Sequence, residues 1–363
     1  MKALTVHDSN NTSIYDIVLS DSFKHLGNYF KGLNVINRRI CIITENNVAK
    51  HYLDEILNIF LASAKETFFY IFEAGEANKN LNTINCIYKK LITCQFDRKD
   101  LLVALGGGVV GDMTGYAAAT YLRGIDFIQI PTSLLSQVDS SIGGKTGVDF
   151  NSYKNMVGAF YQPKLVYINV STLLTLNNRE YYSGMGEVIK HGLIKSRNYY
   201  EWLKGNIAGI KERRPDILVD MIHESCDIKR KVVEKDPKEQ GDRALLNFGH
   251  TIGHSIEKLM DFSLLHGECV AIGMIAASYL SYKEDHITKQ MLLDIKDTLH
   301  CFELPLKIKY SSCDEILRVT KLDKKMEAGK IKFILLKEIG HAMIDKNLSD
   351  EQILESIEYI REV

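Results

Sequence analysis

Short apolar runs alternate with helical stretches through the first half of the chain, and this alternation constrains the fold more than any other feature. The runs are rich in Ile, Val, Phe and Tyr, the residue types that favour strands. They cover Ile40 to Thr44, Phe68 to Phe72, Leu101 to Leu105, Phe127 to Ile130 and Leu165 to Val170. Parallel strands need intervening helices, because the chain must cross back before each new strand begins. The first half is therefore expected to form an α/β domain with a parallel sheet.

Helical periodicity replaces this pattern after the segment Leu173 to Arg179. Apolar residues then recur at helical spacing, and a single late run is strand-like. The predicted helices cover Pro215 to Lys235, Thr251 to Met260, Val270 to Lys283 and Asp350 to Arg361, and the predicted strand covers Ile331 to Lys337. A chain of 363 residues is also long for one domain. We therefore predict an α/β domain over residues 1–178 and a mainly α-helical domain over residues 179–363.

Composition and charge exclude several classes of protein. Lys and Arg number 45 against 46 Asp and Glu, so the net charge of -1 gives no basic footprint for nucleic acid. Seven cysteines without a C-x-x-C pair argue against a disulfide framework or a zinc ribbon and suit a reducing compartment. The N-terminus lacks the apolar run of a signal peptide, and the longest apolar stretch, Val270 to Leu280, is too short to span a bilayer. We expect a cytoplasmic protein that binds neither membrane nor nucleic acid.

A glycine-rich segment follows one of the predicted strands. The stretch LLVALGGGVVGDMTG places Gly106, Gly108 and Gly111 in G-x-G-x-x-G spacing, between the apolar run and a small-residue helix predicted over Met113 to Leu122. Such glycines let the backbone approach a pyrophosphate, which the first helical N–H groups then bind. The same spacing is also typical of a tight strand-to-helix turn without a ligand. A Rossmann-like nucleotide-binding domain and a purely structural turn are both compatible with this segment.

A second candidate anion site lies in the stretch VDSSIGGKTGVD, and it nearly matches a P-loop. Gly144, Lys145 and Thr146 supply the G-K-T, but the position five before Gly144 is Asp139 instead of glycine. A carboxylate there would repel a cradled phosphate, which argues against an ATP-binding P-loop. Lys145 can still contact a substrate phosphate as a point charge. The alternative interpretation is a glycine-rich surface turn with a solvated lysine.

Candidate metal ligands gather in the second half, in the stretches GMGEVIKHG, LNFGHTIGHSIE and LLHGECVAIG. On a helix, His250, His254 and Glu257 share one face, and Glu187 and His191 share another. A catalytic zinc takes three nitrogen or oxygen ligands from the protein and leaves its fourth position for substrate. Several triplets satisfy this rule, and the spacing does not choose among them.

With these segments in view, the chain resembles the 3-dehydroquinate synthase family, and more broadly the sugar phosphate cyclases. The resemblance runs through ordered blocks over essentially the whole chain. These blocks are GEANKNL, GGGVVGDMTGYAAATYLRG, PTSLLSQVDSSIGGKTGVDF, KNMVGAFYQP, GMGEVIKHGLI, RALLNFGHTIGHSIE, HGECVAIGM and the DKK before GKIKFILL. A chance glycine motif does not produce so many blocks in order. The resemblance implies a Rossmann-like NAD-binding domain followed by a mainly helical domain that binds metal and substrate.

The resemblance also implies an activity. Enzymes of this family are phosphate lyases of the shikimate pathway, which leads to chorismate and the aromatic amino acids. They convert 3-deoxy-D-arabino-heptulosonate 7-phosphate to 3-dehydroquinate and phosphate. The implied sequence is transient oxidation by NAD, elimination of phosphate, return of the hydride, ring opening and intramolecular aldol closure. The implied cofactors are NAD and Zn²⁺, with Co²⁺ as an alternative metal, and the implied assembly is a homodimer.

Site residues follow from the resemblance position by position. The implied metal ligands are Glu187, His250 and His266, which leaves His191 and His254 without a metal. The implied substrate contacts share polar or charged side chains, with Lys190 and His254 as candidates for proton transfer. They are Arg123, Lys145, Asn155, Lys190, Lys229, Glu239, Arg243, Asn247, His254 and one of Lys324 and Lys325. Several cations suit a substrate that carries a carboxylate and a phosphate.

The implied NAD contacts lie in the first half and concentrate around the glycine turn. They are Glu45, Asn47, Glu76, Lys79, Gly107, Gly108, Val109, Asp112, Thr132, Ser133, Leu135, Asp139, Ser140, Lys145, Lys154, Thr175 and Leu176. Two positions depart from the family's pattern. Ser133 stands where a threonine is usual and keeps the hydroxyl, whereas Glu45 stands where an aspartate is usual and is longer.

Three other functions stay open on the sequence. A sister cyclase that acts on sedoheptulose 7-phosphate would keep the NAD and metal residues but alter the groups that face the substrate carboxylate. The features that favour a substrate with a carboxylate are Arg123, Asn155, Arg243 and the run Asp323-Lys324-Lys325. A metal-dependent polyol or alcohol dehydrogenase has a related two-domain shape, and the dense set of cations argues against its neutral substrates. A non-catalytic nucleotide-binding protein needs neither the metal residues nor the substrate residues.

Overall fold

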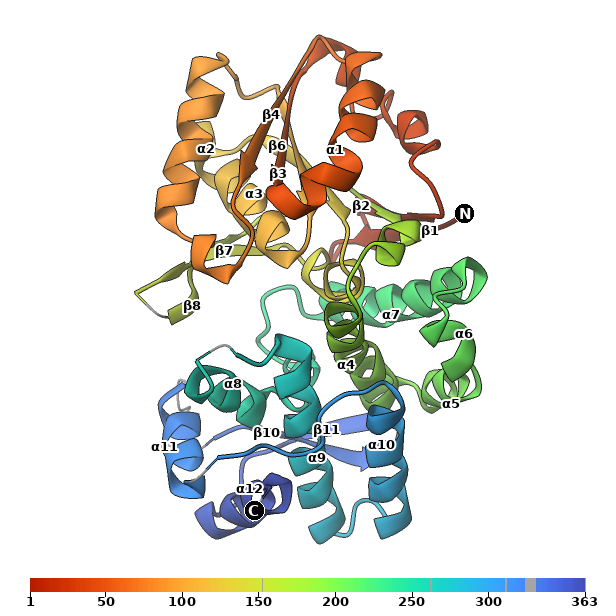
Figure 1. Cartoon of the computed structure of the whole chain (residues 1–363), viewed down its shortest axis with the longest axis vertical. Helices are drawn as coiled ribbons and strands as arrows, with labels where there is room; N and C mark the ends of the chain where they lie inside the picture. Colours follow the sequence, from red (N-terminus) through yellow and green to blue (C-terminus); the bar gives the residue numbers. More distant parts are fainter. Residues whose placement is uncertain (152, 262, 311, 324–330, 363) are drawn as a thin grey trace. The chain divides into compact units, whose positions relative to one another are not determined.

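The computed structural model describes residues 1–151, 153–261, 263–310, 312–323 and 331–362 (Figure 1). The chain divides into two compact units. Unit 1 comprises Met1–Leu176 and Leu218–Arg230, and unit 2 comprises Asn177–Ile217 and Lys231–Val363. Helix α7 (Pro215–Lys235) therefore gives its middle to unit 1 and its two ends to unit 2.

Unit 1 is built on a seven-stranded sheet with the order β1-β2-β9-β6-β5-β3-β4. The strands are β1 (Lys2–His7), β2 (Ser13–Ser20), β3 (Arg39–Glu45), β4 (Glu66–Phe72), β5 (Leu101–Gly106), β6 (Asp126–Pro131) and β9 (Leu165–Asn169). The five predicted strands are present and pair in parallel, which confirms the α/β fold. The antiparallel pair β1-β2 was not predicted. Strand β1 has one buried residue, Val6, and lacks the apolar run that marked the others.

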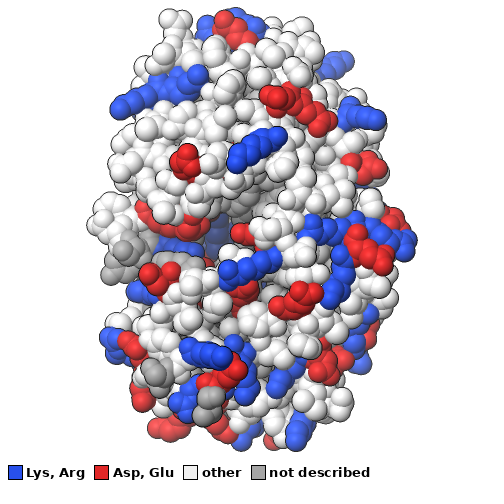
Figure 2. Space-filling model, in the orientation of Figure 1, with Lys and Arg blue, Asp and Glu red and all other residues white. Residues whose placement is uncertain are grey.

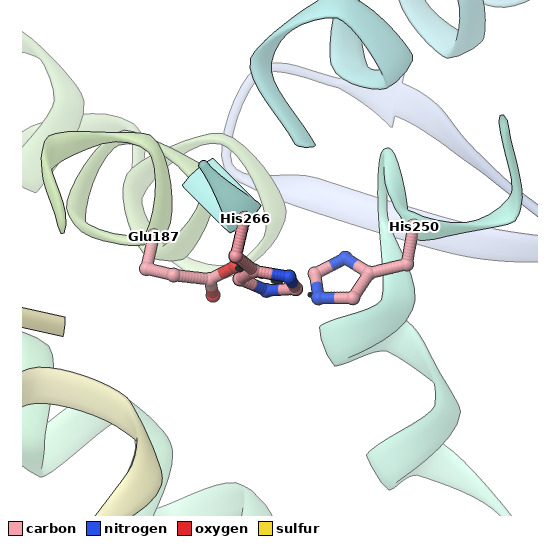
Figure 3. Close-up of side chains that lie close together, drawn as sticks. All are labelled: Glu187, His250 and His266. Atoms are coloured by element: carbon pink, nitrogen blue, oxygen red, sulfur yellow. Dashed lines mark ion pairs between the residues drawn. The ribbon is translucent and has the colours of Figure 1, made fainter. Parts of the chain in front are cut away.

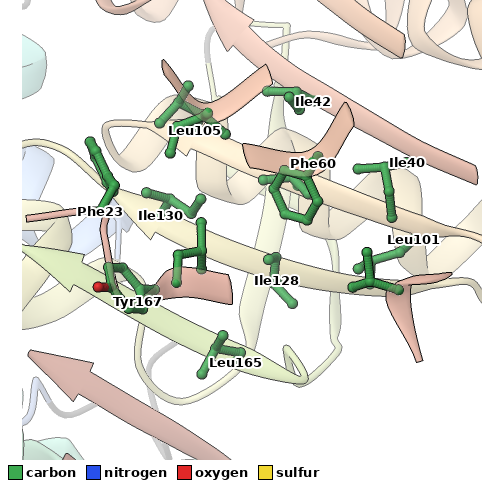
Figure 4. Close-up of a cluster of buried hydrophobic side chains, with 14 of the residues drawn as sticks. Phe23, Ile40, Ile42, Phe60, Leu101, Leu105, Ile128, Ile130, Leu165 and Tyr167 are labelled. Carbon is green, nitrogen blue, oxygen red and sulfur yellow. The ribbon is translucent and has the colours of Figure 1, made fainter. Parts of the chain in front are cut away.

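The central strands of the unit 1 sheet are buried on both faces. Along β5, Leu101, Val103 and Leu105 join the core cluster drawn in Figure 4, which also includes residues of helix α1 (Asn46–Leu61). Leu102 and Ala104 point to the other face and join a second cluster with helices α2 (Leu81–Thr93) and α3 (Gly108–Thr120). Because neighbouring residues of a strand point to opposite faces, a strand covered on both sides must be apolar throughout. This explains the uninterrupted LLVAL run.

Helix α3 corrects the predicted start of the helix after the glycine turn. The helix begins at Gly108, five residues before the predicted Met113, and ends at Thr120. Glycine is a poor helix former, so its frequency in the first turns hid the true start. The glycines allow close packing, since a Cβ on Gly115 would lie 2.4 Å from Cγ2 of the buried Thr146. Beyond the helix, Leu122 adopts a left-handed conformation with φ 49°.

The remaining segments of unit 1 are short. Strands β7 (Lys145–Phe150) and β8 (Tyr153–Phe160) form a separate antiparallel pair. Gly143 and Gly144 precede β7 and have φ angles of 101° and 67°. Glycine adopts these positive φ angles readily because it has no Cβ. The single-turn helices are η1 (Leu26–Tyr29), η2 (Val35–Asn37), η3 (Glu76–Asn78), η4 (Tyr121–Arg123), η6 (Val170–Leu174) and a π-helical turn, η5 (Ser136–Ser140).

Unit 2 is mainly helical, as predicted. Its helices are α4 (Asn178–Lys195), α5 (Arg197–Gly205), α6 (Ile207–Lys211), η7 (Asp242–Asn247), α8 (His250–Leu259), α9 (His266–Lys283), α10 (Lys289–Cys301), α11 (Cys313–Asp323) and α12 (Asp350–Ile360). The predicted late strand is β10 (Phe333–Glu338), but it has a partner that was not predicted, β11 (His341–Asp345). Helix α9 begins at His266, four residues before the predicted Val270.

Helix α9 is the central element of unit 2. It packs against α4, α8, α10, α12 and β10. Its apolar stretch from Val270 to Leu280 is buried on nearly every side, which is the pattern of a core helix. Among the described residues, no helix has the length and apolar character needed to cross a membrane.

Charged residues of both signs are interspersed on the face shown in Figure 2. Neither sign covers a continuous region there, in agreement with the net charge of -1. Clusters of buried charge in the interior are therefore more informative about function than the surface.

Candidate active site

Three side chains from three helices of unit 2 meet at one point (Figure 3). Glu187 comes from α4, and His250 and His266 are the first residues of α8 and α9. Their ligand atoms lie within 4.8 Å of one another. Oε1 of Glu187 is 3.5 Å from Nε2 of His250 and 3.6 Å from Nε2 of His266. One carboxylate oxygen and two imidazole nitrogens thus converge in the number and kind that a catalytic zinc takes.

Glu187 is a buried carboxylate with open coordination sites. It is fully buried, and neither of its oxygens accepts a hydrogen bond from a described residue, although Lys190 forms an ion pair with Oε2. Burial raises the pKa of Glu187, but Lys190 and the two nearby histidines outweigh burial and hold this pKa well below its ordinary value. The carboxylate is therefore ionised. Buried oxygens with negative charge and no hydrogen bonds fit a cation.

His250 is held in its neutral form. Its Nδ1 lies 3.1 Å from the carbonyl oxygen of Phe248, so an Nδ1–H donates there and the lone pair of Nε2 faces Glu187. Burial and the nearby Lys190 ammonium lower the pKa of His250 well below its ordinary value. A neutral ring with a fixed tautomer is the form that binds metal.

His266 lies between two carboxylates. Its Nε2 faces Glu187, and its Nδ1 is 3.6 Å from Oε2 of Glu257. Burial lowers the pKa of His266, but the two carboxylates outweigh burial and raise it to about 9. In the absence of a metal both ring nitrogens of this histidine are therefore protonated at neutral pH. A bound metal cation would replace one of these two protons.

His254 completes a cluster of three imidazoles. Its ring centroid is 5.1 Å from that of His250 and 5.9 Å from that of His266. A second group with metal-ligand geometry, His254, Glu257 and His266, shares His266 with the first. His191 is fully buried on α4, one turn after Glu187. Within unit 2 the structure thus reduces the triplets that spacing left open to two.

Glycines adjoin all three members of the first group, and the sequence interpretation gave them no role. Gly249 precedes His250 and has φ 80°, a left-handed conformation that suits glycine. Its carbonyl oxygen would lie 1.9 Å from a Cβ on Gly273 of α9. Helices α8 and α9 therefore touch backbone to backbone. This contact lets two histidines at helix starts reach the same point.

The segment from Asp236 to Asn247 holds three more predicted residues of unit 2. Arg243 is 2% exposed, and its Nη1 donates to the carbonyl oxygen of Pro237. Asn247 donates from Nδ2 to Oε1 of Glu239 over 2.9 Å. The two remaining lysines, Lys324 and Lys325, lie outside the described residues.

In unit 1, the glycine turn lies where the resemblance places the NAD contacts. Gly107 caps α3 and Gly108 is its first residue, so the first N–H groups of the helix are available to an anion. A Cβ on Gly107 would lie 3.4 Å from Oγ of Ser133, and one on Gly108 would lie 3.2 Å from Oγ of Ser140. The turn thus packs against the segment after β6, which carries the predicted contacts Thr132, Ser133, Leu135, Asp139 and Ser140. Val109 is the second residue of the helix.

Lys79 gathers several of the predicted residues around one ammonium group. It is 4% exposed, and Nζ donates to Oδ2 of Asp112 over 2.7 Å and to Oδ1 of Asn155 over 2.6 Å. Glu76 lies 4.0 Å from Nζ of Lys79 and 3.6 Å from Nζ of Lys154. Burial lowers the pKa of Lys79, but Asp112 and Glu76 outweigh burial and raise it. This cation is therefore permanently charged.

Two further pairs tie predicted residues together in unit 1. Lys229 of α7 donates to the side chain and to the carbonyl oxygen of Asp139, which lies in the π-helical turn η5. Such turns are frequent at functional sites. Thr175 shares a hydrogen bond with the hydroxyl of Tyr52, next to Leu176.

Three predicted residues of unit 1 have other placements. Both carboxylate oxygens of Glu45 cap helix α1, through the N–H groups of Asn47 and Val48. Arg123 is exposed, with φ 67°. Lys145 is exposed at the first residue of β7. None of these three belongs to the cluster around Lys79.

Comparisons with known proteins match one enzyme family over most of the chain. The model of the 3-dehydroquinate synthase N-terminal domain matches residues 69–183, and that of the C-terminal domain matches residues 184–326. A curated protein of Acetivibrio thermocellus named 3-dehydroquinate synthase is 43% identical over 343 residues, which cover 94% of this chain and 95% of that protein.

Solved structures have the same fold. A structure of 2-deoxy-scyllo-inosose synthase with carbaglucose-6-phosphate, NAD⁺ and Co²⁺ matches with a TM-score of 0.88 at 24% identity, over 98% of this chain and 99% of that one. A 2-epi-5-epi-valiolone synthase of Streptomyces hygroscopicus with NAD⁺ and Zn²⁺ bound also matches with a TM-score of 0.88, at 25% identity, over 95% of this chain and 96% of that one. From the family models and the curated relative, we conclude that this chain belongs to the 3-dehydroquinate synthase family.

Proposed function

We propose that this protein is an NAD- and metal-dependent phosphate lyase that converts 3-deoxy-D-arabino-heptulosonate 7-phosphate to 3-dehydroquinate and phosphate in the shikimate pathway. The observation that carries the proposal is the convergence of Glu187, His250 and His266 within 4.8 Å in a chain that is 43% identical to curated 3-dehydroquinate synthases. The 25% identity to a valiolone synthase is much lower, which favours this substrate over that of a sister cyclase.

Glu187, His250 and His266 hold the metal in this proposal. Zn²⁺ suits one carboxylate and two imidazoles, and Co²⁺ accepts the same donors. Related structures hold one or the other ion together with NAD⁺. When bound, the metal supplies a Lewis acid for a substrate hydroxyl and NAD supplies a hydride acceptor that later returns the hydride.

The glycine turn of unit 1 binds the pyrophosphate of NAD. Gly107 and Gly108 leave space for close approach, and the start of α3 presents N–H groups to the phosphate oxygens. Asp112 and Lys79 form a buried pair that orients polar groups of the cofactor. Glu76, Thr132, Ser133, Leu135, Asp139, Ser140, Lys154, Thr175 and Leu176 add contacts, and Glu45 and Asn47 do so near the adenosine.

Cations and amides bind the substrate. Arg123, Lys145, Lys229, Arg243 and one of Lys324 and Lys325 pair with its carboxylate and phosphate, because arginine can bind either group through two hydrogen bonds. Asn155, Glu239 and Asn247 bind its hydroxyl groups. His254, in the imidazole cluster, and Lys190, beside Glu187, transfer protons.

Organisation and location are part of the proposal. Residues 1–178 form the NAD-binding domain and residues 179–363 form the domain that binds metal and substrate. The family resemblance supports a homodimer. All seven cysteines are free, which supports a cytoplasmic location.

The test is a substrate comparison with metal-depleted and metal-restored protein. We expect no turnover after chelation, and recovery with Zn²⁺ or Co²⁺ when the heptulosonate phosphate and NAD are present. Sedoheptulose 7-phosphate under the same conditions should give no turnover. Preference for sedoheptulose 7-phosphate would assign the protein to a sister cyclase instead.

A further inference from the structure

We propose that Glu257 is a positioning residue for the metal site, which fixes the orientation and tautomer of His266 without binding the metal itself. The inference rests on the proposed metal set of Glu187, His250 and His266 and adds a residue that this set lacks. Glu257 lies on α8, three residues after His254, and is 4% exposed.

The geometry places one carboxylate at each nitrogen of the His266 ring. Oε2 of Glu257 is 3.6 Å from Nδ1, and Oε1 of Glu187 is 3.6 Å from Nε2. A proton on Nδ1 therefore points at Glu257, which leaves the lone pair of Nε2 on the side of Glu187. With the roles reversed, Nε2 would carry the proton and could not bind a metal beside Glu187.

His250 shows the same arrangement with a different partner. Its Nδ1 donates to the carbonyl oxygen of Phe248 over 3.1 Å, and its Nε2 lies 3.5 Å from Oε1 of Glu187. Both histidines thus present Nε2 to one carboxylate oxygen and have an acceptor at Nδ1. Histidines that bind metals generally donate their second N–H to a carbonyl or a carboxylate, which fixes the ring and makes it a better ligand. Glu257 does for His266 what the carbonyl of Phe248 does for His250.

The alternative is that Glu257 is itself a ligand, in the group with His254 and His266. A metal there would use Nδ1 of His266 and leave Glu187 without a metal. Glu187 is fully buried, and neither of its oxygens accepts a hydrogen bond from a described residue. The lone pair of Nε2 of His250 would then face Oε1 of Glu187 over 3.5 Å with no metal between these two acceptors, which is unfavourable. The structure therefore favours the metal at Glu187 and the positioning role for Glu257.

The test is metal affinity in Glu257→Gln, a nearly isosteric change that removes the charge. Purified protein is stripped of metal and titrated with Zn²⁺ against a competing chelator, and the visible spectrum is recorded after addition of Co²⁺. We expect an affinity about 10- to 100-fold weaker than that of the unchanged protein, as for loss of a carboxylate that orients a metal-bound histidine. The Co²⁺ spectrum should keep its form at saturation, since the ligands are the same. The circular dichroism spectrum without metal should stay unchanged, which shows that the variant is folded.

Glu268→Gln is the matched control. Glu268 lies at the start of α9, two residues after His266. Its carboxylate accepts hydrogen bonds from the backbone N–H of Leu265 and from the guanidinium of Arg179 on α4. It tests whether loss of any carboxylate near this helix start weakens metal binding, and we expect wild-type affinity. Glu257→Ala should weaken metal binding more than Glu257→Gln does, because glutamine still offers an oxygen to Nδ1.

Two results would overturn the inference. Wild-type metal affinity in both Glu257→Gln and Glu257→Ala would show that His266 needs no partner at Nδ1. Complete loss of metal in Glu257→Gln, with retention in Glu187→Ala, would make Glu257 a ligand. Glu187→Ala and His266→Ala are measured in parallel, so failure of the metal set itself is distinguishable. Glu187→Ala would then keep the metal, whereas His266→Ala would still lose it if His254, Glu257 and His266 are the ligands.

Discussion

Gly186 and Gly267 bring helices α4 and α9 into backbone contact, since a Cβ on Gly186 would lie 2.8 Å from the carbonyl oxygen of Gly267. In the other direction, a Cβ on Gly267 would lie 1.8 Å from the carbonyl oxygen of Ser183. Glu187 follows Gly186 in the chain, and His266 precedes Gly267. The contact between the two glycines therefore sets the separation of two proposed ligands.

Gly267→Ala should push α9 away from α4 and so weaken both the fold and the metal site. We expect loss of at least about 1–3 kcal/mol of unfolding free energy, as for overpacking in a core, and a large loss of Zn²⁺ affinity. Denaturant unfolding and metal titration measure the two effects. Gly205→Ala is the control, because nothing outside its own stretch of chain lies within 4 Å of its Cβ position, so it should leave Zn²⁺ affinity as it was and should not lower the unfolding free energy. Normal zinc binding in Gly267→Ala would contradict the role of this contact.

Removal of any proposed ligand should abolish stable metal binding. Glu187→Ala, His250→Ala and His266→Ala each leave two protein ligands, too few for a zinc site of this kind. His191→Ala should retain the metal, although His191 is also buried on α4. Metal analysis after gel filtration gives the stoichiometry. Retention in His266→Ala together with loss in His191→Ala would refute the assignment.

Arg243→Ala should act on substrate and leave the cofactor unaffected. The loss of a buried cation that pairs with a substrate anion is expected to lower kcat/KM. The fall should correspond to about 2–5 kcal/mol of lost transition-state binding. The NAD dissociation constant should stay nearly unchanged, because Arg243 lies outside the glycine turn and the Lys79 cluster. Steady-state kinetics and NAD titration by fluorescence separate the two quantities. Arg214→Ala is a control at the surface, where the arginine forms an ion pair with Asp216. Normal turnover in Arg243→Ala would remove this residue from the site.

The sequence predicted the central strands, which are buried on both faces, and the edge strand β4, but it missed β1, β2 and β11. The LLVAL run of β5 is apolar because both faces of the sheet are covered, so it was found from composition alone. Strands β1 and β11 each have a single buried residue, Val6 and Ala342. Their residues do not differ enough from loop residues to be recognised without a partner strand. The start of α3 at Gly108 was missed for a related reason. Glycine has a low helix propensity and is present there because of tertiary packing, which the local sequence does not show.

The candidate metal site was only partly predictable. Spacing put His250, His254 and Glu257 on one helix face, and it could not show that His266 and Glu187 arrive from two other helices. That depends on backbone contacts through glycines, which are tertiary in origin. The family resemblance supplied the triplet that spacing left open. The Nδ1 partners of the two histidines, the carbonyl of Phe248 and the carboxylate of Glu257, could be identified only from coordinates.

The unfolding free energy should fall at alkaline pH because the buried thiol of Cys41 resists ionisation in the folded state. Burial is the main cause that raises the pKa of Cys41 on β3 from 9.0 to about 12. The folded state therefore keeps this proton while the unfolded state loses it. The stabilising contribution is complete below about pH 9 and is lost as pH rises to about 12, at ~1.4 kcal/mol per pH unit. Cys41→Ala should reduce the slope of unfolding free energy against pH by that amount in this window. Ile43→Val, on the same strand, should lower stability at every pH and leave the slope as it was.

NAD should act as a catalyst and not as a stoichiometric oxidant. With the heptulosonate phosphate in large excess over NAD, and with Zn²⁺ present, we expect phosphate release to exceed the NAD supplied many times over. No NADH should accumulate, since the cofactor takes a hydride from the substrate and returns it before the product leaves, so the net redox change is zero. The proposed cations and the imidazole cluster retain the substrate through both transfers, which keeps the two steps in one site. Phosphate release, product absorbance and absorbance at the NADH band are followed in the same reaction. Accumulation of NADH equal to the NAD supplied would instead indicate a dehydrogenase.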